Sequence, residues 1–150
     1  ADFNRFGAAL MAHGLRFAYH PHGFEFVKTA DGTLFDELLR RTDPQRVDFQ
    51  MDVFWIHHGG ADPVALLERH PGRFTTLHLK DMRKGEPTGF TTGRASHPTS
   101  VALGIGQLNL PAILRAAAKA GVKRYYIEDE SPYASFQVPV SQAFLRTVRF

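Results

Sequence analysis

The sequence predicts an α/β fold in which four parallel strands alternate with helices. Three observations support this prediction: short apolar and aromatic runs alternate with stretches of helical periodicity, few residues separate most elements, and each run ends with an ionisable residue. Strict alternation of this kind implies parallel strands joined by right-handed crossovers. Four such strands can form an open sheet, or half of an eight-stranded barrel.

The predicted elements follow one another along the whole chain. Residues 3–13 space apolar side chains at intervals of three and four, and Gly14 fits as a stop, so this stretch predicts the first helix. Asp62 and Asn109 each come just before a proline, in the pattern of helix N-caps. One irregular segment occupies 82–107. The predicted strands are 15–20, 46–52, 73–81 and 123–129, and the other predicted helices are 32–41, 62–70, 109–120 and one from near 139 to the end.

The composition fits one domain that spans residues 1–150. Hydrophobic residues make up 43% of the chain and charged residues 22%, which is enough for one core and too little for two. The net charge of +3 is scattered along the sequence, which argues against nucleic acid or a membrane surface as a partner. Cysteine is absent, and no apolar stretch approaches the roughly 20 residues of a membrane helix. We therefore expect a cytoplasmic protein.

Ionisable residues mark the carboxyl end of every predicted strand. Parallel strands are buried on both faces, so a charged or imidazole side chain within them is unusual. The carboxyl ends of such strands are also where α/β folds place their ligand sites. The residues concerned are His20 and His22 on the first strand, Asp52 on the second, His78 and Lys80 on the third, and Glu128 on the fourth.

Together these strand ends offer the mixed nitrogen and oxygen donors that suit a divalent metal ion. Mn²⁺ is the first expectation, with Zn²⁺, Co²⁺, Fe²⁺ or Mg²⁺ as alternatives. A single histidine at a strand end is more often a hydrogen-bonded structural residue, and a single aspartate is often a helix cap. The joint pattern therefore carries the prediction. The predicted metal ligands are His20, Asp52, His78 and Glu128.

Five further residues are candidates for contact with a substrate: His22, Glu25, Trp55, His58 and Arg83. The pair of histidines that ends at position 58 is expected in a loop beyond the second strand, where a solvated loop pair is the alternative. Trp55 would wall a sugar site or simply cover the mouth of a barrel. Glu25 would hold a substrate hydroxyl or remain a surface carboxylate. Arg83 would bind an anion, or belong to a flexible lid.

Five motifs carry a resemblance to a known family. In chain order, "YHPHGFEF", "QMDVFW", "LHLKDM", "ALGIGQLNLPAIL" and "YYIEDES" resemble the later half of the xylose-isomerase-like TIM-barrel proteins, the sugar phosphate isomerase/epimerase group. The resemblance implies a divalent metal held by Glu, Asp, His and Glu. By position it makes Asp52, His78 and Glu128 ligands. The first glutamate is missing, and His20 stands in its place, or His22 if the alignment slips by two residues.

The resemblance implies a divalent-metal-dependent sugar isomerase or epimerase that removes a proton next to a carbonyl through a metal-bound enediolate. Glu128 would be the base, His20 the proton carrier, and Lys80 would steady the developing charge. The alternatives are a keto-sugar or keto-glycoside lyase/hydratase of the same superfamily, and a catalytically inactive half-barrel. Cleavage of abasic DNA is disfavoured because no basic stretch is present.

The chain supplies half of a (β/α)8 TIM barrel, because such a barrel needs eight strands and about 250 residues. Its first and last strands would be edges with unpaired backbone groups. We therefore expect a second copy to complete the barrel by dimerisation, or a missing N-terminal half-barrel to do so, with a small sugar or keto-sugar as the ligand.

Overall fold

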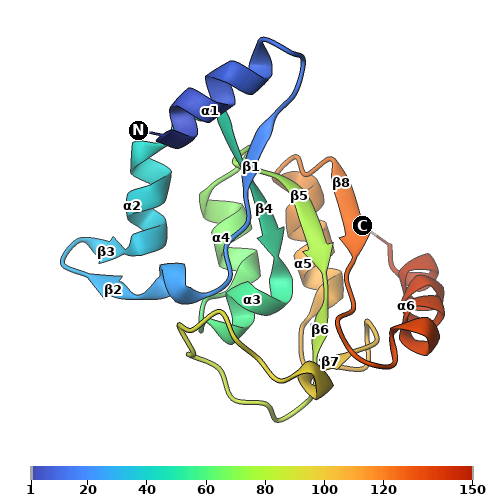
Figure 1. Cartoon of the computed structure of the whole chain (residues 1–150). Helices are drawn as coiled ribbons and strands as arrows, with labels where there is room; N and C mark the ends of the chain where they lie inside the picture. Colours follow the sequence, from blue (N-terminus) through green and yellow to red (C-terminus); the bar gives the residue numbers. More distant parts are fainter. Residues whose placement is uncertain (1, 150) are drawn as a thin grey trace.

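The computed structural model describes residues 2–149, the side chain of His97 excepted, and it has a four-stranded parallel sheet at its centre (Figure 1). The sheet order is β1-β4-β5-β8, and all three neighbouring pairs are parallel. Its strands are β1 (Phe17–Tyr19), β4 (Val47–Asp52), β5 (Phe74–Leu79) and β8 (Arg124–Ile127). This arrangement confirms the predicted α/β fold of a partial TIM barrel.

Six helices connect and flank these strands, and local capping explains where several of them begin. Thr33 and Asp36 form a reciprocal capping box at the start of α2. The side chains of Asp62 and Asn109 accept backbone N–H groups at the starts of α4 and α5, as predicted. The helices are α1 (Asp2–Met11), α2 (Leu34–Arg41), α3 (Val53–His58), α4 (Pro63–Arg69), α5 (Leu110–Lys119) and α6 (Ala134–Thr147).

Helix α3 was not predicted, and its presence corrects the expected position of His57 and His58. Both residues lie in this helix and not in a loop. The cause is Asp52, which ends β4 and caps α3 at once, because its Oδ1 accepts the backbone N–H groups of Phe54 and Trp55 at 2.9 and 3.0 Å. The chain therefore turns directly from strand into helix.

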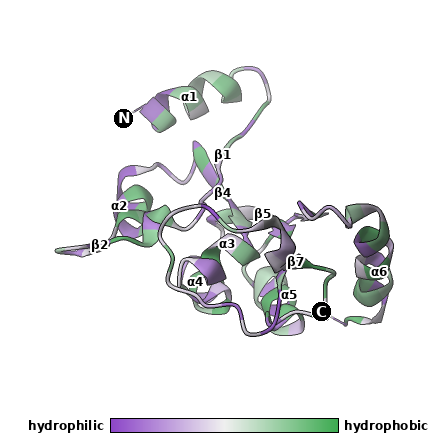
Figure 2. Ribbon diagram, turned by 60° about the horizontal axis from the view of Figure 1, so that its bottom comes forward, coloured by the Kyte–Doolittle hydropathy of each residue, from purple (hydrophilic) through white to green (hydrophobic). Residues whose placement is uncertain are grey.

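Helix α6 also begins earlier than predicted, at Ala134, and it contains Pro139. A proline inside a helix removes one backbone donor, which is why the sequence favoured a start at that residue. A tertiary contact holds the extended helix in place: Ser141 Oγ accepts the backbone N–H of Leu103 at 3.0 Å and donates to the carbonyl of Gln137. Helix α1 lies beside β1 and α6 beyond β8, so these helices flank the sheet on its two sides (Figure 2).

Short strands and 3-10 helices lie in the connections between the main elements. The predicted irregular segment contains a short antiparallel pair in which Asp81 faces Val101 and Met82 faces Ser100. A second hairpin precedes α2, where a helix had been predicted from residue 32. The small elements are η1 (Phe24–Phe26), β2 (Lys28–Thr29), β3 (Gly32–Thr33), β6 (Asp81–Met82), η2 (His97–Thr99) and β7 (Ser100–Val101). In the described part of the chain, no helix combines the length and hydropathy needed to cross a membrane.

The main core lies between the sheet and the helices on its outer face. The rings of Phe35, Phe49 and Phe74 meet there with centroids 5.4 to 6.0 Å apart. Burial of each such side chain contributes roughly 1.5–3 kcal/mol. Because side chains alternate along a strand, burial of Phe49 against the helices turns Gln50 and Asp52 to the inner face. Hydrophobic packing on one side therefore positions polar groups on the other.

Asp81 fixes the segment that leads from β5 into α5. Its fully buried carboxylate accepts backbone N–H groups from Met82, Gly104, Gly106 and Leu108 at 2.9 to 3.1 Å. A Cβ atom on Gly106 would come within 2.2 Å of Asp81 Oδ1, so only glycine permits this approach. One side chain thus ties together backbone that is 27 residues apart in sequence.

Replacement of this carboxylate should destabilise the fold. Asp81→Ala leaves four buried N–H groups without their acceptor, and we expect it to lower the free energy of unfolding by about 3 kcal/mol. Urea denaturation followed by circular dichroism measures the change. Asp31→Ala, in an exposed turn, is the control and should stay within about 0.5 kcal/mol of wild type. Equal stability of the two variants would show that the Asp81 contacts are energetically neutral.

Candidate metal centre

Three predicted ligands, His20, Asp52 and His78, come together at the carboxyl ends of β1, β4 and β5. One donor atom from each lies within 4.8 Å of the other two. The parallel register explains this convergence, because Asp52 pairs directly with His78, and Tyr19, the residue before His20, pairs with Phe49. The predicted grouping of strand ends is therefore present in the structure.

The spacing of these atoms suits a bound cation. Asp52 Oδ2 lies 4.0 Å from His20 Nε2 and 3.9 Å from His78 Nδ1. Two ligands on one ion, each at roughly 2.1 Å from it, lie at most about 4.2 Å apart. Asp52 Oδ2 is also fully buried and has no hydrogen-bond partner among the described residues. An unpaired buried carboxylate oxygen is costly, so this atom fits a position that a cation stabilises.

Glu128, the fourth predicted ligand, lies outside this three-residue donor group and contacts it through His78. Its Oε2 lies 3.0 Å from His78 Nδ1, and this hydrogen bond is the main reason that the pKa of Glu128 falls to about 2. Burial, reinforced by the nearby Glu128 carboxylate, raises the pKa of Asp52 well above its usual range. The pKa values of the two carboxyl groups are therefore shifted in opposite directions. Glu128 is ionised, while Asp52 retains a proton readily until a cation replaces it.

Gln50 orients the His20 ring. Its Oε1 lies 3.0 Å from His20 Nδ1 and accepts the proton there, which leaves the Nε2 lone pair facing Asp52. Burial lowers the pKa of His20 and so favours the neutral ring that binds metals. His22 stacks near His20 with ring centroids 4.4 Å apart, but it lies outside the three-residue donor group. Period 2 from Asp52 could have found Gln50 in the sequence.

Trp55, predicted for substrate contact, and Lys80, predicted for catalysis, follow the donor residues Asp52 and His78 closely in sequence. They line a cavity of about 350 Å³ together with Phe54, Ser100 and Glu130. Lys80 Nζ lies 4.9 Å from the centroid of the Phe54 ring and 5.2 Å from that of Trp55, and it forms an ion pair with Glu130. Sequence reasoning missed Glu130, although it stands two residues beyond Glu128, and it missed Ser100.

The structure corrects the expected environment of Glu25. This carboxylate is buried and accepts three hydrogen bonds: from Tyr19 Oη at 2.6 Å, and from the backbone N–H groups of His22 and Gly23 at 3.0 and 2.9 Å. Burial and this carboxylate raise the pKa of Tyr19. Glu25 therefore holds the turn after β1, which excludes the alternative of a free surface carboxylate, while its contact with a substrate hydroxyl stays a prediction.

His58 and Arg83 hold the long loop. The buried ring of His58 stacks on Phe54 with centroids 5.8 Å apart, and its carbonyl accepts the N–H groups of Gly89 and Phe90. This placement corrects the expected loop position and excludes the alternative of a solvated loop residue, while contact of His58 with a substrate stays a prediction. Arg83 is exposed, and its guanidinium donates to the carbonyl of Pro98.

Comparison with known proteins identifies the family. The sequence model described as "xylose isomerase-like TIM barrel" matches residues 1–148. The chain belongs to this family. The inosose dehydratase of Geobacillus kaustophilus is 40% identical over 70 residues, which cover 47% of this chain and 22% of that protein. The inosose dehydratase of Mesomycoplasma hyopneumoniae is 32% identical over 102 residues, which cover 68% and 33%.

A solved xylose isomerase-like structure supports the same assignment. The sugar phosphate isomerase/epimerase from Parabacteroides distasonis superposes with a TM-score of 0.76 at 31% identity, and the match covers 98% of this chain and 51% of that protein. The chain thus spans about half of that structure and less of the curated relatives. Its relatives are sugar-processing isomerases, epimerases and dehydratases.

The bond between Glu128 and His78 predicts a pH dependence of stability in the metal-free protein. The folded pKa of about 2 lies below the ordinary value of 4.5, so the stabilisation is present above pH 4.5 and is lost as the pH falls toward 2. The difference in unfolding free energy between wild type and Glu128→Gln should shrink over this range in urea titrations. In a His78→Gln background the dependence should disappear. A difference that stays constant from pH 4.5 to 2 would contradict the assignment.

Proposed function

We propose that this chain is the metal-binding half of a dehydratase that acts on a polyhydroxylated ketone and begins by removing the proton next to the carbonyl. The observation that carries the proposal is the pairing of one ionised carboxylate, Glu128, with a buried cluster of donors at the same strand ends. The similarity to inosose dehydratases supports the same class of reaction. The isomerase or epimerase predicted from the sequence is the second candidate, supported by the Parabacteroides distasonis structure.

His20, Asp52 and His78 would hold a divalent ion, for which Mn²⁺ remains the first candidate. Their imidazoles and buried carboxylate match the ligands of Mn²⁺, Zn²⁺, Fe²⁺ and Co²⁺. When bound, such an ion supplies Lewis-acid polarisation of a carbonyl. Gln50 keeps the His20 ring aligned for this role.

Glu128 is positioned to act as the base. Its carboxylate is ionised and half-buried, so it can accept the proton from the carbon next to a carbonyl. His78 Nδ1, its hydrogen-bond partner, is also the atom that faces Asp52. If His78 Nδ1 binds another partner, Glu128 loses the hydrogen bond that lowers its pKa and becomes a stronger base. The donor cluster and the base are thus coupled through one imidazole.

A single carboxylate base favours elimination over epimerisation. After Glu128 takes the proton, the C–H electron pair forms the new double bond and the neighbouring C–O bond breaks. The Lys80 ammonium, at the edge of the adjacent cavity, can give the leaving hydroxide its proton, and the product is water. Epimerisation would require a second acid at the opposite face of the same carbon, and His20 is the residue available for that role.

Metal binding tests the first step of this proposal. We expect the dialysed chain to bind about one Mn²⁺ per chain in calorimetry, and Asp52→Asn to weaken the affinity at least about a hundredfold. Asp62→Asn is a matched control, because Asp62 is also a helix N-cap and asparagine preserves a cap in both places. Equal Mn²⁺ affinities of the two variants would exclude Asp52 as a ligand.

Deuterium exchange tests the chemistry. The Mn²⁺-loaded chain incubated with D-fructose in D₂O should incorporate deuterium next to the carbonyl, as measured by mass spectrometry, and Glu128→Gln should abolish the incorporation. Asp62→Asn should retain it. A chain that binds Mn²⁺ stoichiometrically and incorporates no deuterium would support the remaining alternative, a catalytically inactive half-barrel.

We also propose that a second copy completes the barrel of the 150-residue chain. β1 and β8 are the two edges of the sheet, and Tyr126 on β8 is 46% exposed. Pairing β1 of each copy with β8 of the other would close eight strands and satisfy both edges. Sedimentation at micromolar concentration should give a dimer. A well-folded monomer under these conditions would contradict this proposal.

A further inference from the structure

The cavity lined by Lys80 and Glu130 lies just beyond the carboxyl ends of β5 and β8, which end at Leu79 and Ile127. The pairs His78 with Glu128 and Lys80 with Glu130 repeat the same arrangement two residues apart. Two residues of extended chain span at most roughly 7 Å, which is about the width of a sugar or cyclitol ring. A ketone anchored at the donor cluster would therefore reach this cavity with its distal carbons.

The cavity contains an unused hydroxyl. Ser100 lines it, is 4% exposed, and its Oγ has no hydrogen-bond partner among the described residues. Unpaired buried polar atoms are uncommon in folded proteins, and a ligand group that bonds to this hydroxyl would account for it. Phe54 and Trp55 add aromatic faces, which suit the C–H surface of a sugar ring, and they hold the Lys80 ammonium in place.

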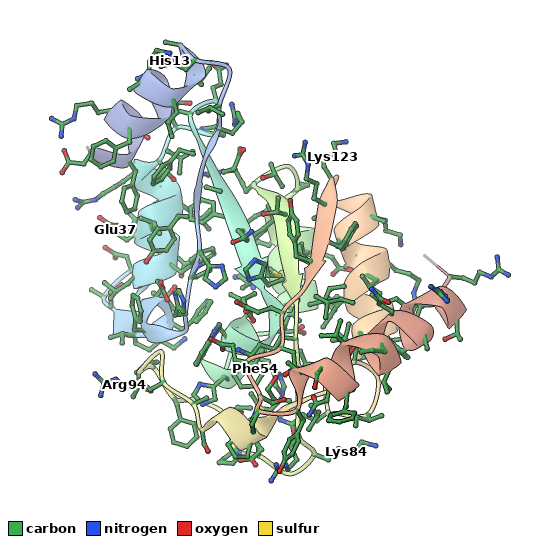
Figure 3. The ribbon with its side chains drawn as sticks, turned by 45° about the vertical axis from the view of Figure 1, so that its right-hand side comes forward. His13, Glu37, Phe54, Lys84, Arg94 and Lys123 are labelled. Atoms are coloured by element: carbon green, nitrogen blue, oxygen red, sulfur yellow. The ribbon has the colours of Figure 1, made fainter. Side chains whose placement is uncertain are left out.

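The buried cation of the cavity, Lys80, is already paired with a carboxylate. The Lys80 ammonium is paired with the Glu130 carboxylate, so a second anion next to it would meet repulsion from Glu130. Arg94, the other cation that lines the cavity, is exposed, and its side chain extends away from the body of the protein (Figure 3). The described lining therefore offers the Lys80–Glu130 pair and the hydroxyl groups of Ser96, Thr99 and Ser100, all of which bond to neutral hydroxyl groups.

We propose that this cavity is a subsite for the uncharged, polyhydroxylated end of the substrate, and that the Lys80–Glu130 pair selects against phosphorylated ligands. Glu130 accepts a hydroxyl proton, Lys80 and Ser100 donate to hydroxyl oxygens, and the aromatic rings cover the carbon face. The orientation of the ligand rests on the proposed function, whereas the selectivity depends on the cavity alone.

The selectivity can be measured in the metal-free chain, which separates it from the metal chemistry. Saturation-transfer NMR titrations with D-fructose and D-fructose 6-phosphate, in the presence of EDTA, compare a neutral ligand with its phosphate. We expect wild type to bind D-fructose roughly tenfold more tightly. Glu130→Gln leaves the Lys80 charge uncompensated, so it should reverse this preference by strengthening the binding of D-fructose 6-phosphate and weakening that of D-fructose.

Two further variants control the interpretation. Glu68→Gln makes the same charge change on the exposed face of α4 and should leave the ratio of affinities as in wild type. Ser100→Ala removes a hydroxyl that has no partner in the protein, so it should preserve the melting temperature while weakening D-fructose several-fold.

A wild-type preference for the phosphorylated sugar would overturn the proposal. An affinity ratio that Glu130→Gln leaves unchanged would do so as well, as would the absence of D-fructose binding at millimolar concentration. Failure of Mn²⁺ to bind, with the selectivity and its reversal intact, would refute the metal-dependent function and leave the subsite standing.

Discussion

The parallel pairing of β4 with β1 on one side and β5 on the other is the constraint from which the rest of this structure follows. The register sets Asp52 opposite His78, and the alternation of side chains sends Phe49 and Met51 into the helix-covered core while it turns Gln50 and Asp52 to the inner face. A shift of one residue in this pairing would exchange the two sets of side chains. The hydrophobic core and the donor cluster are therefore specified by the same backbone hydrogen bonds.

Asp52 shows how closely fold and chemistry are joined. One of its carboxylate oxygens begins α3 by accepting two backbone N–H groups, and the other faces His20 and His78 without a partner. The capping bonds fix the position of the carboxylate, so the unpaired oxygen is held in place before any ion arrives. Such pre-organisation reduces the reordering that binding would otherwise require. It also places an unpaired acceptor in the interior, which a cation would relieve.

The sequence was most informative where a pattern is local. Four strands, the polar residue at each strand end and the proline-linked helix caps all follow from periodicity and composition, and the structure confirms them. Tertiary contacts decided the rest. Whether His20 or His22 joins the donors depends on the direction of the ring, which Gln50 sets across the sheet. The burial of Glu25 depends on the turn after β1, whose backbone N–H groups bind a carboxylate that the sequence placed either on a substrate hydroxyl or at the surface. Helix α3 was missed because the metal-ligand role of Asp52 was preferred to its alternative role as a helix cap, and one side chain fills the cap while the other oxygen stays with the donors.

The bonds that Asp81 makes to the backbone have a consequence for how such a protein can change. They connect the end of β5 directly to the residues that lead into α5, so the long excursion between them leaves and returns at two clamped points. Insertions and replacements within that excursion leave the strand and the helix undisturbed. Substrate preference can then diversify through the loop, while the strand ends beneath it keep their geometry through evolution.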